Sequence, residues 1–154
     1  MEEVLRDVWD STGRGKSYGT KVCNARPDGR HRGSKGKCPA SLYYSCQDPY
    51  AVKIAFHVGT DEPVEWTLAR DLIAASLHSR EGIGDVQAWP SAASQNGPKT
   101  LNISMTSPFG HAQFEASAAA IETFLVRTYE LVPEGGEPEY MDFDAELTDL
   151  LSQA

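Results

Sequence analysis

The sequence predicts an α+β fold in which antiparallel β-sheets are covered by helices. From residue 39 onward, the patterns follow in the order strand, hairpin, helix, strand, hairpin, long helix, short helix. Strands joined by tight turns pair in antiparallel fashion, because a parallel pair needs a crossover of about a dozen or more residues. The absence of a β-α-β series argues against a doubly wound nucleotide-binding fold. A length of 154 residues suits one such domain.

Three predicted strands form the first sheet. Residues 41–46 (SLYYSC) make a short strand, residues 50–58 (YAVKIAFHV) alternate clearly, and residues 64–68 (VEWTL) alternate again after a turn at 59–63. Alternation with a period of two places one set of side chains on the buried face. The residues expected to share that face are Val52, Ile54, Phe56 and Val58 in one strand, and Val64, Trp66 and Leu68 in the next.

A helix pattern separates the first sheet from a second one. Residues 69–78 (ARDLIAASLH) are predicted to be helical, because their apolar residues recur at helical spacing. Residues 85–89 form a strand that ends at a proline, and residues 100–107 and 111–116 form a hairpin around a Pro-Phe-Gly turn. The second sheet is therefore also antiparallel.

Two further helices are predicted near the C-terminus. Residues 118–132 form a long helix that Ser117 caps, and residues 143–151 form a short amphipathic helix that Asp142 or Asp144 caps. The stripe of the long helix that we expect in the core is Ile121, Phe124, Leu125, Thr128 and Val132. The apolar residues of the short helix are Phe143, Leu147, Leu150 and Leu151.

The net charge of −8 is unevenly divided along the chain. Residues 1–38 carry nine Lys/Arg and five Asp/Glu, whereas residues 39–154 carry five and seventeen, so the two parts have charges of +4 and −12. Residues 11–37 contain six glycines and only isolated apolar residues, too few to offset the entropy of ordering them. We therefore expect a basic, glycine-rich, disordered extension over residues 1–38, apart from a short amphipathic helix around residues 4–9, and a compact domain over residues 39–154.

Several features predict a cytoplasmic protein without a membrane span. There is no run of the roughly 18 apolar residues that a spanning helix needs. The first ten residues are acidic and lack the apolar core of a secretory signal. The three cysteines have no paired spacing, which is typical of a reduced compartment.

No catalytic, cofactor-binding or metal site is expected. The Gly-Lys-Ser tripeptide at residues 15–17 has Asp10 where a phosphate-binding loop needs its first glycine. The cysteines lack the close spacing of a zinc knuckle, and neither a nucleophile elbow nor an H-E-x-x-H motif occurs. We therefore predict that the protein is not an enzyme.

The C-terminal segment is the best candidate for binding a partner. No basic residue follows Arg127, while eight acidic residues do. Aromatic and aliphatic residues are interleaved with them, as in a segment that docks into a basic groove; a solvated acidic helix face is the alternative. Trp89 is expected to point outward from its strand, unless a loop or the C-terminal helix covers it. The candidate partner-binding residues are Trp89, Tyr140, Phe143, Asp144 and Leu147.

Six blocks of sequence together suggest a family. They are DPYAVKIAFHV (48–58), EPVEWTLARDLIAASL (62–77), GIGDVQAWP (82–90), SPFGHAQFEA (107–116), FLVRTYELVP (124–133) and MDFDAELTDLL (141–151). In order and spacing, residues 39–151 resemble the SsgA-like proteins of sporulating actinobacteria, and the W-T-L-A-R-D-L and G-D-V-x-x-W-P segments resemble the SsgB-like branch.

This resemblance implies a non-enzymatic regulator of sporulation-specific cell division that acts at the septum. SsgB-like members are understood to recruit the tubulin-like division GTPase FtsZ, together with SsgA-type regulators. The resemblance also implies a whirly-like scaffold, as in mitochondrial RNA-binding proteins, and a homo-oligomer, most simply a trimer. The family begins with an apolar alternating strand for which residues 13–38 show no match, so we expect either that this strand is absent or that the N-terminal reading is an artefact of gene prediction.

A nucleic-acid-binding protein is the competing hypothesis. The basic residues of the 1–38 segment permit weak electrostatic binding to a phosphate backbone. The charge of −12 on residues 39–154 repels the same backbone, so such binding is expected from the extension alone.

Overall fold

The computed structural model describes residues 17–25, 38–56, 62–91, 97, 99–108 and 110–153. One sheet has the strand order β1 (Ser17–Ala25), β2 (Cys38–Ser45), β3 (Ala51–Phe56) and β4 (Val64–Ala69). The other has the order β5 (Val86–Pro90), β6 (Thr100–Ser107) and β7 (Gly110–Ser117). The helices are α1 (Arg70–Ser76), α2 (Ala118–Leu131), the 3₁₀ helix η1 (Glu137–Tyr140) and α3 (Phe143–Ser152).

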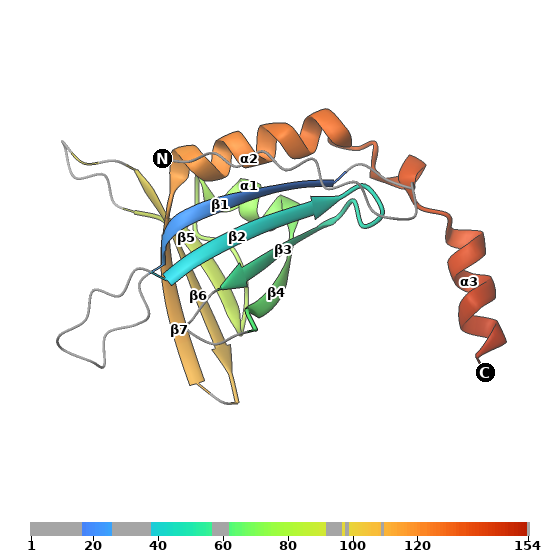
Figure 1. Cartoon of the computed structure of the whole chain (residues 1–154), viewed down its shortest axis with the longest axis horizontal. Helices are drawn as coiled ribbons and strands as arrows, with labels where there is room; N and C mark the ends of the chain where they lie inside the picture. The colour runs from blue at the N-terminus through green and yellow to red at the C-terminus, as the bar shows by residue number, and fades with distance from the viewer. Residues whose placement is uncertain are drawn as a thin grey trace.

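All strand pairs are antiparallel, and the register aligns apolar residues across each sheet. In the first sheet Leu42 lies opposite Ile54. In the second sheet Ile103 lies opposite both Ala88 and Phe114. Figure 1 shows α2 lying along the first sheet, and α1 connects the two sheets. The predicted α+β fold, with antiparallel sheets covered by helices, is confirmed.

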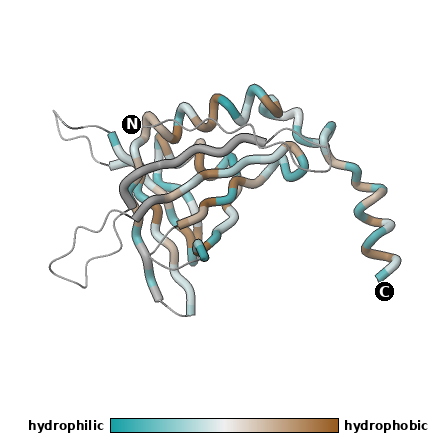
Figure 2. Tube along the Cα trace, in the orientation of Figure 1, coloured by the Kyte–Doolittle hydropathy of each residue, from teal (hydrophilic) through white to brown (hydrophobic). Residues whose placement is uncertain are grey.

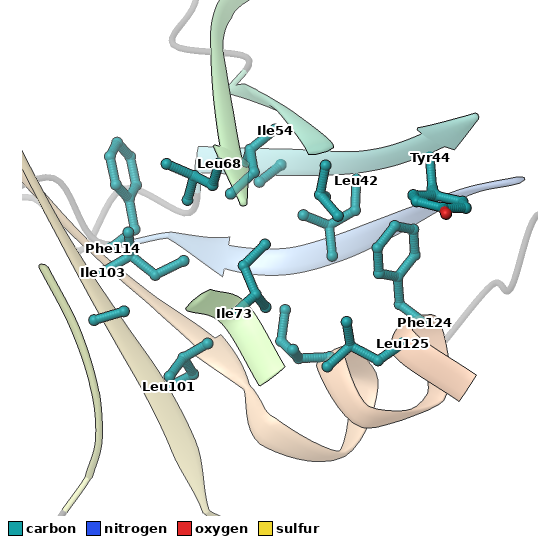
Figure 3. Packing of buried hydrophobic residues seen from close by; sticks show 14 of the residues in the cluster. Leu42, Tyr44, Ile54, Leu68, Ile73, Leu101, Ile103, Phe114, Phe124 and Leu125 are labelled. Carbon is teal, nitrogen blue, oxygen red and sulfur yellow. The ribbon is translucent and has the colours of Figure 1, made fainter. Parts of the chain in front are cut away.

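The core lies between the two sheets and is closed by α1 and α2 (Figure 3). Phe56 of β3 and Phe114 of β7 stack with ring centroids 3.8 Å apart, which joins the sheets directly. Ile73 from α1 and Phe124 from α2 are buried in the same cluster. All five residues of the predicted α2 stripe are buried, and Ser117 caps the helix by accepting a hydrogen bond from Ala120 N. The local periodicity of α2 therefore predicted its buried face correctly.

Strand β4 departs from the predicted burial. Leu68 is buried as expected, but Trp66 is half-buried and Val64 is 46% exposed. Because β4 is the edge strand of its sheet, only its end next to α1 lies fully over the core. In β3, the expected inward residues Val52, Ile54 and Phe56 are all buried, while residue 58 lies outside the described residues.

The expectation that residues 13–38 contain no strand is wrong for β1. This strand pairs with β2 from Ser17↔Ser45 to Val22↔Ala40, so the first sheet begins before residue 39. A strand is held in its sheet by main-chain hydrogen bonds, which need no apolar side chains, and the sparse apolar content of this segment therefore concealed it. Residues 1–16 and 26–37 of the predicted extension, including the helix around residues 4–9, lie outside the described residues, and residue 38 begins β2.

Candidate partner-binding site at the C-terminal helix

Helix α3 forms where the sequence predicts a short amphipathic helix. Asp142 caps it, because its carboxylate accepts a hydrogen bond from Ala145 N at 3.1 Å. Asp144, the other capping candidate, lies in the first turn, where its charge is favoured by the helix dipole. The predicted short helix is confirmed, and of the two capping candidates it is Asp142 that caps it.

The apolar face of α3 is uncovered. Phe143 is 58% exposed, and Leu147, Leu150 and Leu151 are 56%, 68% and 69% exposed. These residues follow the spacing i, i+4, i+7 and i+8, which aligns them on one side of a helix. Figure 1 shows α3 projecting from the body of the molecule, and Figure 2 shows hydrophobic and hydrophilic residues alternating along it. An apolar stripe on a projecting helix is typical of a docking surface.

The charge of this region is entirely negative. Helix α3 carries Asp144, Glu146 and Asp149, and no Lys or Arg follows Arg127 in the sequence. Tyr140 of η1, which is exposed, precedes the apolar stripe. A complementary surface therefore combines an apolar floor with basic residues at its rim.

A buried arginine lies at the opposite end of this segment. Arg70, the first residue of α1, is 1% exposed. Its Nη1 donates hydrogen bonds to Thr128 O at 3.3 Å, which also accepts from Val132 N, and to Val132 O at 2.9 Å, both at the end of α2. Its Nη2 forms a 2.5 Å ion pair with Glu137 Oε1 in η1. Arg70 therefore joins α1, α2 and η1.

Two tyrosines pack against the faces of this guanidinium. The Arg70 Cζ atom lies 5.0 Å from the ring centre of Tyr44 and 4.5 Å from that of Tyr129, distances that fit cation–π contacts. Burial raises the pKa of Tyr44 to about 12, and its hydroxyl donates a hydrogen bond to Pro49 O at 2.9 Å. Within the described part of the chain, Arg70 Nε has no hydrogen-bond partner.

The pKa of Glu137 is lowered from that of an ordinary glutamate. The first cause is a hydrogen bond from its own backbone N–H, and the second is the hydrogen bond from Arg70. Both stabilise the carboxylate, so Glu137 is ionised over the whole neutral range. The sequence did not predict this pair, because Glu137 lies 67 residues from Arg70 and local patterns do not connect residues so far apart.

Trp89 belongs to a different surface. Its indole is half-buried, and the guanidinium of Arg80 lies 4.3 Å from its ring centre. The loop that precedes β5 therefore covers it in part, as the alternative interpretation expected. Figure 1 shows β5 and α3 at different ends of the molecule. The five candidate residues thus form two regions: Tyr140, Phe143, Asp144 and Leu147 together, and Trp89 apart from them.

The described residues contain no group of three or more His, Cys, Asp or Glu side chains arranged to hold a metal ion. Over the same part of the chain, no helix combines the length and apolar character that crossing a membrane requires. The C-terminal region presents an apolar stripe, acidic residues beside it and a buried ion pair at its base.

Comparison with known proteins identifies relatives for most of the chain. Residues 38–137 match the family described as Streptomyces sporulation and cell division protein, SsgA. The sporulation-specific cell division protein SsgB of Thermobifida fusca is 52% identical over 114 residues, which are 73% of this chain and 80% of that one. SsgB of Streptomyces coelicolor is 47% identical over 116 residues, 75% of this chain and 83% of that one.

A solved structure is similar throughout the fold. The crystal structure of an SsgA-like sporulation-specific cell division protein from Thermobifida fusca superimposes with a TM-score of 0.75 at 44% sequence identity. The match covers 88% of this chain and 96% of that one.

Proposed function

The chain belongs to the SsgA family, a non-enzymatic family of sporulation-specific cell division proteins, and on that basis we propose that it helps to place the sporulation septum by recruiting the division GTPase FtsZ. Family membership is the observation that carries this proposal. In it, the protein acts in the cytoplasm at the septum, by protein–protein contact, together with SsgA-type regulators. A whirly-like scaffold and a homotrimer belong to the same proposal, because the resemblance implies both.

The proposed contact with the partner is the apolar stripe of α3. Four of the ten residues of this helix are exposed apolar residues aligned on one side, and contiguous exposed apolar surface marks interaction sites. The acidic residues beside them favour a partner groove with basic residues at its rim. The contact residues in this proposal are Tyr140, Phe143, Asp144 and Leu147, and Trp89 marks a second, separate contact region.

A localisation experiment tests the proposed role. The protein is fused to a fluorescent protein and expressed in sporulating hyphae of an actinobacterium that lacks its own SsgB. We expect foci and then regular ladders at the future septa, before the septa close, and restored sporulation. A diffuse signal throughout septation would refute the proposal, provided that the fusion is intact and abundant.

A binding experiment tests the proposed contact. We expect Leu147→Ala to weaken co-sedimentation with purified FtsZ polymers by about tenfold, because truncating a central apolar contact typically costs 1–2 kcal/mol or more. The matched control is Val126→Ala, since Val126 is 57% exposed on α2 and Leu147 is 56% exposed on α3. Equal effects of the two substitutions would assign the contact to another surface.

A further inference from the structure

We propose that the Arg70–Glu137 ion pair is a positioning device that fixes the direction of α3. This inference rests on the proposed function, in which α3 is the docking helix. It starts from one observation: of residues 133–153, only Glu137 is buried. The end of the described chain is therefore attached to the body mainly at one side chain, and that side chain carries a charge.

Arg70, the residue that binds Glu137, is held in place by contacts with several elements of the body. Arg70 donates hydrogen bonds to two carbonyl groups at the end of α2 and contacts the rings of both Tyr44 and Tyr129. The guanidinium is planar and rigid, so the two hydrogen bonds of Nη1 also fix the direction in which the N–H groups of Nη2 point. The 2.5 Å contact with Glu137 Oε1 uses that remaining direction. The position of Glu137 is thus determined by the body and not by the C-terminal segment.

The connection from this ion pair to α3 is short. Glu137 is the first residue of η1, whose second residue is a proline with a fixed φ angle. Met141 N donates to Pro138 O at 3.3 Å, and Asp142 already caps α3. Two residues therefore separate the 3₁₀ helix from α3. Fixing Glu137 limits the directions in which α3 points, and releasing Glu137 frees the whole segment.

The consequence is a docking helix that is oriented before it meets its partner. A helix that samples many directions binds with an affinity reduced by the fraction of time it spends in the productive one. If release of Glu137 lowered that fraction to one fifth, the dissociation constant would rise about fivefold. The apolar core cluster contains no side chain of this segment, so the cost to the body of releasing Glu137 is confined to Arg70, which loses its charged partner.

Distance measurements by pulsed electron paramagnetic resonance test the inference. Nitroxide labels are attached through a keto amino acid at Thr123 on α2 and Thr148 on α3, which leaves the native cysteines untouched. Labelled chains are diluted into an excess of unlabelled chains, so that only distances within one chain are recorded. We expect one narrow distribution for the starting protein and a broad one for Glu137→Ala. Glu134→Ala is the matched control, because Glu134 is an exposed acidic residue of the same segment, and it should leave the distribution narrow.

The outcomes separate this inference from the proposed function. A broad distribution with weaker FtsZ binding supports both. A broad distribution with unchanged FtsZ binding supports the positioning role and refutes docking through α3. An unchanged distribution in Glu137→Ala overturns the inference, whatever happens to binding. If Glu137→Ala unfolds the body, Arg70→Met combined with Glu137→Ala is measured instead, because this pair leaves no buried charge without a partner.

Discussion

The loop between α1 and β5 makes a sharp prediction about two glycines. Gly82 and Gly84 flank Ile83, whose side chain is almost fully exposed, and both have positive φ angles, of 93° and 78°. Two backbone hydrogen bonds between Glu81 and Ala88, of 2.8 and 2.9 Å, close the loop. The two glycines differ in their surroundings: a Cβ on Gly84 would meet nothing within 4 Å, whereas a Cβ on Gly82 would overlap the carbonyl oxygen of Val86.

This difference sets the expected magnitudes. Placing an L-residue at a positive φ angle destabilises the folded state by about 1–2 kcal/mol. Replacing glycine by alanine also lowers the conformational entropy of the unfolded chain, which stabilises the protein by about 0.4–1 kcal/mol. Gly84→Ala should therefore destabilise the protein by at most about 1.6 kcal/mol. Gly82→Ala adds an overlap with a backbone oxygen that cannot rotate away, and such overpacking costs roughly 1–3 kcal/mol more. We expect Gly82→Ala to cost about 1–4.6 kcal/mol in total, which is about 1–3 kcal/mol more than Gly84→Ala.

Urea unfolding, followed by tryptophan fluorescence, measures both free energies. The comparison is informative because the two substitutions are chemically identical, lie two residues apart and change the unfolded chain in the same way. A difference of less than about 0.5 kcal/mol between them would refute the reasoning, since it would mean that the loop moves away from the Val86 carbonyl at no cost. A difference above about 1 kcal/mol would show that the loop is rigid.

Three further predictions follow from the core and from the buried anchor. Burial raises the folded-state pKa of Tyr44 to about 12, above the ordinary tyrosine pKa of about 10. The contribution of Tyr44 to the free energy of unfolding is therefore complete below about pH 10 and is lost as the pH rises through about 12. Urea unfolding at alkaline pH should show that Tyr44→Phe abolishes this loss. Because the folded-state pKa of Glu137 is lowered, its contribution to the free energy of unfolding is complete above the ordinary glutamate pKa and is lost as the pH falls through the folded-state pKa. Glu137→Gln should remove this loss of stability in acid; an unchanged dependence of the unfolding free energy on acidic pH would contradict the prediction. Phe124→Ala should lower the free energy of unfolding by about 3–5 kcal/mol, because the ring is fully buried, and a loss below about 1 kcal/mol would mean that it does not pack as described.

Local patterns account for what the sequence predicted well. The alternation of β3 and the stripe of α2 depend on neighbours within a few residues, and both buried faces were predicted correctly. The stripe of α3 was equally clear, but periodicity identifies only which face is apolar and not what covers it; all four residues prove to be exposed. Burial relative to other elements needs the tertiary arrangement, as Val64 at the edge of its sheet also illustrates.

Two features were beyond the reach of local patterns. Strand β1 depends on backbone pairing with β2, which leaves little trace in side-chain composition. The Arg70–Glu137 pair joins residues 67 positions apart, and nothing in the sequence near Arg70 distinguishes a buried arginine from a solvated one at a helix start.

The buried arginine also has a consequence for synthesis on the ribosome. Domains begin to fold as the chain emerges, N-terminal part first. Arg70 emerges long before its acceptors, which are Thr128, Val132 and Glu137. Until those residues leave the exit tunnel, burying the guanidinium would leave a charge without a partner, which is strongly unfavourable. Residues 38–69 are therefore free to pair into strands early, whereas α1 is locked in place only when almost the entire chain has been made.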